Sequence, residues 1–304
     1  MKRYLYNFAD LLIADEAGQT SPEIAAASFA LAKRAVIVGD EYQIPPVWGT
    51  SRLLDISLAL EAGVIRSAED FRLLEESGLN ASESSLMRAA SQSCCFHKHG
   101  PGLFLCEHRR CYNEIIGYCN ELIYNGHLKP SREDHPNKLP CLGYHDIPVA
   151  HAEKAGTSRA NPQEAEAIAV WLNENFPKLR NIYDVNKVKD NEIIAVITPF
   201  KAQTARIKSA IKQHCGDLAK NIGVGTVHTF QGAERKVIIF STVYGHEDNC
   251  GFIDGNKNLM NVAVSRAKDA FWVFGSIGCL KDKPLDTASG LMYSYVKNSI
   301  INKL

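Results

Sequence analysis

The chain has 304 residues, a formal net charge of zero, 45% hydrophobic residues and 22% charged residues. This length is enough for one large or two ordinary domains, and the composition is that of a soluble globular protein. No apolar run is as long as a membrane span and no signal-peptide pattern appears, so we expect no membrane partner and a cytoplasmic location. Because the net charge is zero, any binding of nucleic acid must use a local basic surface.

The nine cysteines lack paired spacing, which predicts reduced thiols rather than a disulfide framework. One group of cysteine and histidine residues lies close together in the sequence: Cys94, Cys95, His97, His99, Cys106 and His108. The group is either a zinc site or a loop that happens to contain these residues. We favour the loop, because the CxxC and HxxxH spacings typical of zinc sites do not occur.

The N-terminal part of the sequence alternates strand, helix and strand. An apolar run that ends in acids, 10–16, predicts a buried parallel strand, and Ser21 followed by Pro22 is typical of a helix start. A second apolar run ends at Gly39 and Asp40 and predicts another strand. This order is that of a βαβ unit, which builds a parallel sheet.

Residues 49–100 are mostly polar and helical in pattern, and 114–128 predict an amphipathic helix closed by Asn125-Gly126. One strand is expected near 147–151. A helix start follows at Asn161 and Pro162, with Glu164 three residues after the cap. The remaining pattern predicts a second α/β unit, with expected elements at 192–200 (strand), 201–215 (helix), 224–245 (two strands around a loop) and 259–276 (helix, then strand).

Asp15 and Glu16 at the end of the first strand suit a metal–nucleotide site. One carboxylate can hold the hydration shell of a magnesium ion and the next can orient or deprotonate a water. Gln43, after the sharp turn at Gly39, can hydrogen-bond both a water and a terminal phosphate. The alternatives are a solvated turn for the acids and an ordinary proline-stopped loop for Gln43.

Arginines occur at two places that suit phosphate chemistry. Arg109 and Arg110 stand just before a predicted helix, and Arg266 lies near Lys268. A guanidinium stabilises charge on a transferring phosphate better than an ammonium does. Arginine near a helix start is more often a surface residue, which is the alternative.

The loop after the strand near 223 combines donors with a glycine turn. Thr226, His228 and Thr229 offer donors to phosphates, and Gln231-Gly232 permits a close backbone approach. Glu234 can accept from a ribose hydroxyl. Thr198, Phe200 and Gln203, at another strand end, offer an aromatic ring for base stacking and polar groups beside it.

Six segments in this order and spacing resemble motifs II to VI of superfamily 1 helicases, in the branch of the nonsense-mediated-decay helicase: "DEAGQ", "GDEYQIPP", "EHRR", "ITPFKAQ", "TVHTFQGAE" and "NVAVSRAK". The resemblance covers about residues 8–276. It implies an α/β fold of two RecA-like domains, with ATP and magnesium in the cleft between them and single-stranded DNA or RNA lying across both.

The resemblance also implies residue roles. Asp15 would hold magnesium through water, Glu16 would be the catalytic base, and Gln43 would contact the γ-phosphate. Arg109 and Arg266 would be the arginine fingers, although Arg110 stands where the family more usually has an apolar residue. The remaining expected contacts are with the nucleotide (Gln231, Gly232 and Glu234) and with nucleic acid (Thr198, Phe200, Gln203, Thr226 and His228).

The phosphate loop of this family, GxxxxGK[ST], is absent, since the chain contains no Gly-Lys dipeptide. Its backbone N–H groups and lysine hold the β- and γ-phosphates, so ATP turnover by this chain alone should be negligible. We therefore expect a truncated first RecA-like domain at 1–85, a complete second one at 86–285 and a tail at 286–304. In the family, the phosphate-loop strand pairs beside 35–38, so this edge should be apolar and unpaired.

Three interpretations follow. The first is the C-terminal part of an ATP-dependent helicase or translocase. The second is a non-enzymatic module that binds a single strand or a partner protein, with the ATPase residues as relics. The third is complementation, in which another chain supplies the phosphate loop.

Overall fold

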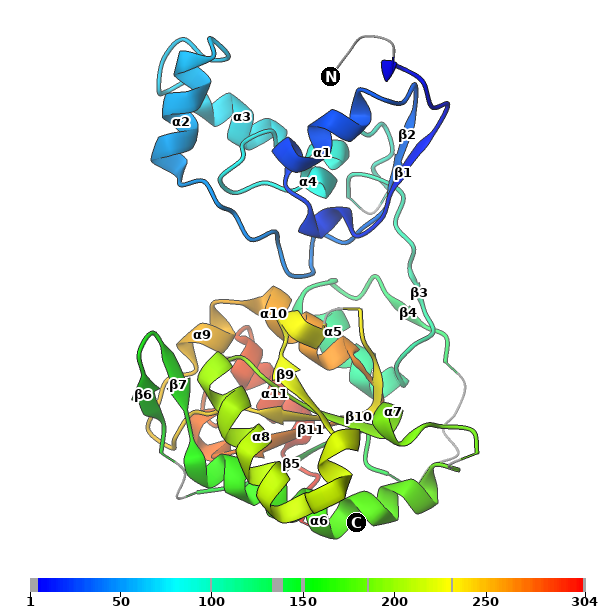
Figure 1. The fold of residues 1–304 in the computed structure, drawn as a ribbon, viewed down its shortest axis with the longest axis vertical. Helices are drawn as coiled ribbons and strands as arrows, with labels where there is room; N and C mark the ends of the chain where they lie inside the picture. The colour runs from blue at the N-terminus through cyan, green and yellow to red at the C-terminus, as the bar shows by residue number, and fades with distance from the viewer. Residues whose placement is uncertain are drawn as a thin grey trace. The chain divides into compact units, whose positions relative to one another are not determined.

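A computed structural model describes residues 5–98, 100–132, 139–148, 151–184, 186–230 and 232–302. The chain divides after Leu105 into two compact units, unit 1 and unit 2, each with its own packing (Figure 1). The sequence placed the boundary after Ser85 instead. Helix α4, Leu86–Gln92, packs within unit 1, because Leu86 N donates to Thr20 O at 2.7 Å and its side chain joins the core around Ala17.

Unit 1 contains the expected βαβ arrangement. Strands β1 and β2 pair in parallel, with Leu12 opposite Ala35, and α1 begins at Pro22 after Ser21. The described elements of unit 1 are β1 (Leu12–Ala14), η2 (Ala17–Gln19), α1 (Pro22–Phe29), β2 (Ala35–Ile37), α2 (Arg52–Glu61), α3 (Phe71–Ser77) and α4.

The sheet of unit 1 exposes apolar side chains. Ile13 is 65% exposed, Val36 47% and Val38 42%. Among the described residues, β2 pairs with β1 and with no other strand, which confirms the apolar, unpaired edge expected near 35–38. Such an edge is a site for pairing with another strand.

Two glycines let the loops after β1 and β2 approach each other closely. A Cβ built on Gly18 would lie 2.5 Å from the Asp40 carbonyl oxygen, and one built on Gly39 would lie 2.9 Å from the backbone nitrogens of Ala17 and Gly18. Ala17 N donates to Val38 O at 2.9 Å in the same contact. Glycine is therefore required at both positions if the loops are to touch.

We expect Gly39→Ala to loosen unit 1 selectively. Displacing the packed backbone should cost about 1–3 kcal/mol, which would speed local amide exchange roughly fivefold or more. Hydrogen–deuterium exchange of peptides covering β1 and β2 measures this directly. Gly49→Ala is the matched control, because a Cβ at Gly49 meets no atom within 4 Å. Equal exchange in both variants would contradict the argument.

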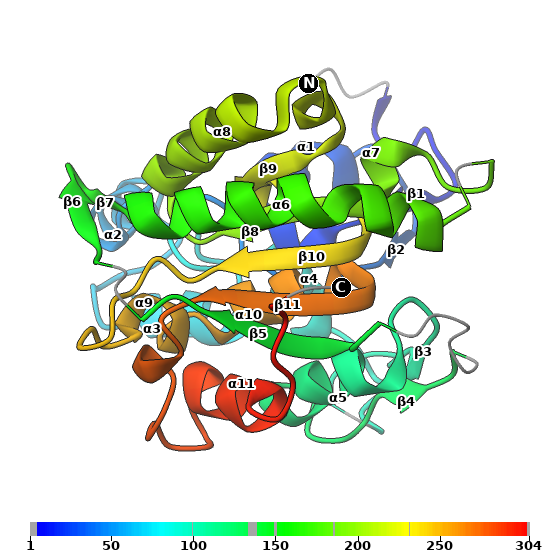
Figure 2. The same cartoon turned by 90° about the horizontal axis from the view of Figure 1, so that it is seen from below.

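Unit 2 is built on a five-stranded parallel sheet with strand order β5-β11-β10-β8-β9. Helices α6 and α8 cover one face, and α5, α10 and α11 cover the other (Figure 2). The elements are β3 (Glu107–His108), α5 (Asn113–Leu122), β4 (Lys129–Pro130), β5 (Leu142–Asp146), β6 (Glu153–Ala155), β7 (Ser158–Ala160), α6 (Pro162–Ile182), α7 (Asp190–Ile193), β8 (Ile194–Thr198), α8 (Lys201–Cys215), η3 (Gly216–Asn221), β9 (Gly223–Thr226), η4 (His228–Phe230), β10 (Arg235–Ser241), α9 (Gly251–Asp254), α10 (Lys257–Ser265), β11 (Ala267–Gly275), η5 (Ile277–Cys279) and α11 (Ala288–Val296). The expected α/β class is confirmed.

The core of unit 2 lies between the sheet and helices α6 and α8. Strand β8 is buried along its whole length, as expected for a parallel strand covered on both faces. Trp171 of α6 packs edge-on against Trp272 and Phe274 of β11, with ring centroids 5.5 and 5.4 Å apart. These large buried rings join the helix layer to the sheet.

One sequence expectation for unit 2 differs from the structure. A strand was expected near 147–151, of which residues 149 and 150 lie outside the described ones; the described strand is β5, Leu142–Asp146, and Pro148 after it has no N–H to donate to a ladder. The described part of the expected tail, 286–302, packs on unit 2, since α11 contacts α5 and Ile301 N donates to Tyr144 O at 2.7 Å. All nine cysteines are free thiols, and no described helix is both long and apolar enough to cross a bilayer.

Candidate functional site

Asp15 and Glu16 follow directly on the carboxyl end of β1. Glu16 has φ 52° and ψ 36°, a left-handed conformation that is strained for a residue with a side chain. Its backbone N–H donates to Asp15 Oδ1 at 2.8 Å, and Gln19 Nε2 donates to Glu16 Oε2 at 2.7 Å. Both carboxylates are exposed at the strand end, where they can meet a hydrated cation and a water.

The turn after β2 brings Gln43 to the same end of the two-stranded sheet. Asp40 organises this turn, because Tyr42 N donates to Asp40 Oδ1 at 2.9 Å and Gln43 N to Asp40 O at 3.4 Å. Since β1 and β2 are parallel, the structure places Asp15, Glu16 and Gln43 at one carboxyl edge.

A charged cluster occupies the amino edge of the sheet in unit 2. Glu234 precedes β10 and forms ion pairs with Arg110 and with Lys268, whose Nζ lies 2.7 Å from Glu234 Oε2. Burial by itself would raise the pKa of Glu234, but the hydrogen bond from Lys268 and the Arg110 charge outweigh it and lower that pKa. Arg266 precedes β11, is 4% exposed and donates from Nε to Val262 O at 3.3 Å.

Arg110, and not Arg109, lies in this cluster. Arg109 points to the surface, where its side chain is 74% exposed and pairs with Glu107 at 2.7 Å. His108 is half-buried beside Arg110, and burial together with the Arg110 charge lowers its pKa to about 4. His108 is therefore neutral at physiological pH, and the positive charge of the cluster comes from Arg110, Arg266 and Lys268.

Arg132 holds the arginine segment in place, a role that sequence reasoning missed. Its guanidinium donates to Arg110 O at 2.9 Å and to Asp269 Oδ1 at 2.6 Å, and it lies 3.7 Å from the ring centroid of Tyr112. Asp269 is 2% exposed on β11. A lone arginine in a polar loop carries no local pattern that could reveal such a distant partner.

The residues expected to contact nucleic acid lie at the carboxyl edge, the opposite end of the strands. Strand β10 has seven residues, so the two edges are roughly 20 Å apart. Phe200 is half-buried at the start of α8, Thr226 ends β9, and His228 is exposed. The structure thus separates the expected nucleic-acid residues of unit 2 from its charged cluster.

Thr198 and Gln203 differ from this expectation, because both are fully buried. Gln203 Oε1 accepts from Asn161 N at 2.7 Å, and its Nε2 donates to Ser241 Oγ at 3.1 Å. These bonds occupy the amide inside the protein. Neither side chain is accessible to a bound strand in this structure.

Glu164 is the most unusual residue near this edge. In a capping box this carboxylate would accept from the Asn161 N–H, but here Gln203 Oε1 accepts from that N–H. The carboxylate accepts from Ser241 Oγ and from Val243 N, at 3.0 Å for the latter. Burial raises the pKa of Glu164 to about 8. Val243 has φ 73°, an outlier for a β-branched residue.

Three further expectations concern nucleotide and metal ligands. Gly232 has φ 79°, the positive value that the expected tight turn requires, whereas Gln231 lies outside the described residues. His99 of the cysteine–histidine group also lies outside them. Among the residues described, no group of three or more metal-ligating side chains occurs.

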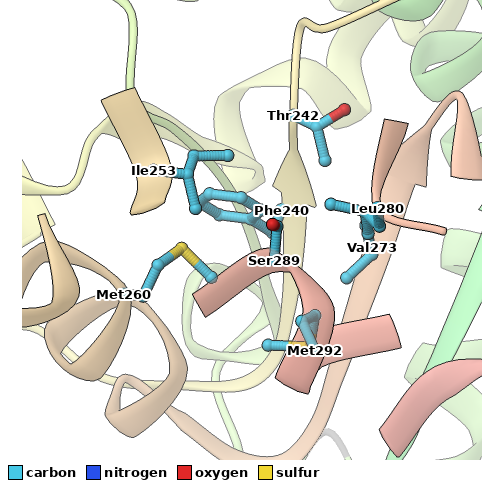
Figure 3. A pocket seen from close by; sticks show the side chains of 8 residues that line it. All are labelled: Phe240, Thr242, Ile253, Met260, Val273, Leu280, Ser289 and Met292. Atoms are coloured by element: carbon cyan, nitrogen blue, oxygen red, sulfur yellow. The ribbon is translucent and has the colours of Figure 1, made fainter. Parts of the chain in front are cut away.

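A small cavity of about 10 Å³ lies between the carboxyl ends of β10 and β11 and helices α9 to α11 (Figure 3). Its lining is mainly apolar and consists of Phe240, Thr242, Ile253, Met260, Val273, Leu280, Ser289 and Met292. This volume corresponds to about one water molecule. The cavity is therefore a packing gap rather than a nucleotide pocket.

Comparisons with known proteins identify the family of the chain. A family model described as an AAA domain matches residues 82–278. The probable helicase MAGATAMA 3 of Arabidopsis thaliana is 27% identical over 291 residues, covering 91% of this chain and 31% of that protein. The 5'-3' DNA helicase ZGRF1 of Mus musculus is 31% identical over 213 residues, covering 67% of this chain and 11% of that protein.

The chain spans about a third or less of the length of these relatives. A solved arterivirus helicase, nonstructural protein 10 in complex with DNA, is 14% identical with a TM-score of 0.40, over 95% of this chain and 43% of that chain. That similarity is too weak to add to the assignment, which rests on the family model and the sequence relatives. The chain therefore belongs to the superfamily 1 helicase family and carries its AAA domain over residues 82–278.

Proposed function

We propose that the chain is the C-terminal motor portion of an ATP-dependent nucleic-acid helicase or translocase. The observation that carries this proposal is the division of unit 2 into a charged cluster at one end of its strands and an aromatic, donor-bearing surface at the other. A motor needs both surfaces, because ATP hydrolysis must be coupled to the binding of a nucleic-acid strand. Single-stranded DNA or RNA is the proposed substrate.

In unit 1, Asp15, Glu16 and Gln43 fit the chemistry of magnesium and ATP. The exposed carboxylates of Asp15 and Glu16 are the hard oxygen ligands that magnesium takes, partly through water. Asp15 would hold the hydration shell of the ion, and Glu16 would accept a proton from the attacking water. Gln43 would donate its amide to the γ-phosphate. The bound ion would neutralise charge on the phosphates.

In unit 2, we assign the arginine-finger role to Arg110 and Arg266 rather than to Arg109. The ion pair with Glu234 keeps the Arg110 guanidinium in place, whereas Arg109 pairs with Glu107 on the surface. Glu234 would accept from a ribose hydroxyl, and its place next to the turn at Gly232 supports this role. A guanidinium of this kind stabilises charge on the transferring phosphate.

The chain has no Gly-Lys dipeptide, so its own residues do not provide a phosphate loop. We propose that another segment of polypeptide supplies this loop, either in the same protein or as a partner chain. The exposed strand edge of β2 offers a place for it to pair. Without that segment, Asp15 and Glu16 have no held phosphate to act on.

The second candidate is a non-enzymatic module that binds a single strand or a partner protein. Unit 2 favours it, because its sheet is covered by helices on both faces and its core is continuous without any contribution from a phosphate loop. Both candidates share strand binding and differ in ATP turnover.

We expect the 304-residue chain to bind a labelled single-stranded oligonucleotide equally well with and without ATP, and to show no ATP turnover above background. Anisotropy titrations and a phosphate-release assay test both parts, with Glu16→Gln as the matched variant that should leave binding unchanged. Turnover that Glu16→Gln abolishes would show that the chain supplies a complete site. Failure to bind any single strand at 0.1 M salt or below would sink the proposal.

A further inference from the structure

Three aromatic rings from different segments meet at the carboxyl edge of unit 2. Phe200, at the start of α8, lies 5.7 Å from Tyr244 and 5.3 Å from Phe252 of α9, as measured between ring centroids. Tyr244 is 2% exposed, whereas Phe252 is 44% exposed. The buried ring therefore supports two rings that reach the surface.

Phe252 is held in place by its backbone. Phe252 N donates to the Tyr244 hydroxyl oxygen at 3.2 Å, which fixes the start of α9 against the buried ring. The planes of Phe200 and Phe252 are inclined by 39°. Two pre-positioned, partly exposed rings lose little conformational entropy on contact with a flat ligand.

The β6–β7 hairpin carries positive charge next to these rings. Lys154 and Arg159 are directly opposite each other in the antiparallel pair, an arrangement that like charges disfavour. Arg159 lies 5.5 Å from the Tyr244 ring and 3.4 Å from Asp248, while Lys154 is exposed and has no ion pair among the described residues. Lys154 and Arg159 therefore place two cations on one face of the hairpin, whereas the adjacent Glu153 of β6 alternates to the other face.

A hydrogen bond places the hairpin beside the aromatic rings. Ala202 N donates to Ser158 Oγ at 3.2 Å, which joins the hairpin to the start of α8 two residues after Phe200. Both ribbon views show the β6–β7 hairpin and α9 on the same side of unit 2 (Figures 1 and 2). Positive charge and stacking surface are thus contiguous.

We propose that Phe200, Phe252, Lys154 and Arg159 form a subsite for single-stranded nucleic acid. The two phenylalanine rings stack on one base, and the two cations contact the phosphates that flank it. Stacking on aromatic rings is tolerant of sequence, as a translocating motor requires. The inference rests on the proposed function and assigns three residues, Phe252, Lys154 and Arg159, that no motif of the sequence indicates.

Fluorescence anisotropy with 12-nucleotide oligothymidylate and oligouridylate, each titrated with the full chain at several salt concentrations, tests the stacking part. Phe252→Ala should weaken binding roughly tenfold at every salt concentration, and Phe252→Trp should restore it. Ile182→Ala is the matched control, because Ile182 is 40% exposed at the far end of α6. Phe252→Leu keeps the apolar surface without the aromatic ring, so binding by this variant should also be weak.

The charged part has a separate readout. Lys154→Gln should reduce the slope of log affinity against log salt by about 0.7, the change expected for one lost phosphate contact to a single strand. Phe252→Ala should leave the slope unchanged, and so should the control Lys220→Gln, beyond the opposite end of α8. Binding at the wild-type level and slope in both Phe252→Ala and Lys154→Gln would overturn the subsite while leaving the proposed function intact. Absence of binding by the wild-type chain would overturn both.

Discussion

Replacing Glu164 with glutamine is expected to stabilise unit 2 at pH 8.5 by a few kcal/mol and to leave it nearly unchanged at pH 5. The pKa of Glu164 is about 8 in the folded protein against an ordinary value of 4.5, and burial is the main cause. Between pH 4.5 and about pH 8, the Glu164 carboxyl therefore holds its proton more tightly in the folded state than in the unfolded state. The resulting stability is fully present below pH 4.5 and is lost as the pH rises to about 8.

The size of this loss follows from the shift. Each pKa unit corresponds to about 1.4 kcal/mol, so the wild-type chain should lose up to about 5 kcal/mol of stability across this range through Glu164 alone. The neutral amide of glutamine resembles the protonated carboxyl and does not titrate. Its oxygen can still accept the Val243 N–H, so the strained backbone at Val243 keeps its support.

Urea unfolding at pH 5, 7 and 8.5, followed by the fluorescence of the buried Trp171 and Trp272, measures the effect. Glu174→Gln, an exposed position on the same helix, is the matched control and should keep the pH dependence of the wild type. Equal slopes of stability against pH in Glu164→Gln and the wild-type chain would contradict the buried, protonated carboxyl.

Glu164 also shows where sequence reasoning reaches its limit. The run from Asn161 to Glu164 predicted a helix start, and the Asn161 side chain does accept from Glu164 N at 3.0 Å. The local sequence spacing is enough to predict this helix start. The direction of the Glu164 carboxylate depends on Ser241 and Val243, which are distant in the chain, and on Gln203, which takes the Asn161 N–H. No local pattern contains those contacts.

The order of elements was predictable for a similar reason. Buried parallel strands such as β8 and β10 are continuous apolar runs, so the sequence alone indicated the α/β class. Strand β5 was misplaced because its sequence, Leu-Gly-Tyr-His-Asp, is not such a run. It is a strand because β11 pairs with it, with Phe271 opposite Leu142.

The choice between Arg109 and Arg110 depends on geometry that adjacent positions cannot show. Extended backbone sends successive side chains to opposite sides, so Glu107 and Arg109 face solvent together while His108 and Arg110 face the protein. The short strand β3 sets this alternation through its pairing with β4. Family spacing favoured Arg109, whereas Arg110 is the residue whose side chain pairs with Glu234.

Arg110→Ala is therefore expected to lower ATP turnover by about 10³-fold or more once a phosphate-loop segment is supplied, by fusion or as a second chain. The guanidinium at 110 is held by Glu234 and by the Arg132 contact to its backbone, so alanine removes a positioned charge. Arg109→Ala, the matched control, removes an exposed arginine paired with Glu107 and should leave turnover close to wild type.

Steady-state phosphate release, with saturating oligonucleotide, measures both variants in the same assembly. Turnover must first be shown to depend on the lysine of the supplied loop, so that the signal belongs to this site. Loss of turnover in Arg109→Ala with retention in Arg110→Ala would reverse the assignment. The ion pair with Glu234 would then be a structural contact, and the finger would have to swing inward from the surface on nucleotide binding. The side-chain alternation set by β3 argues against that movement, because it directs Arg109 and Arg110 to opposite sides and Arg110 already pairs with Glu234.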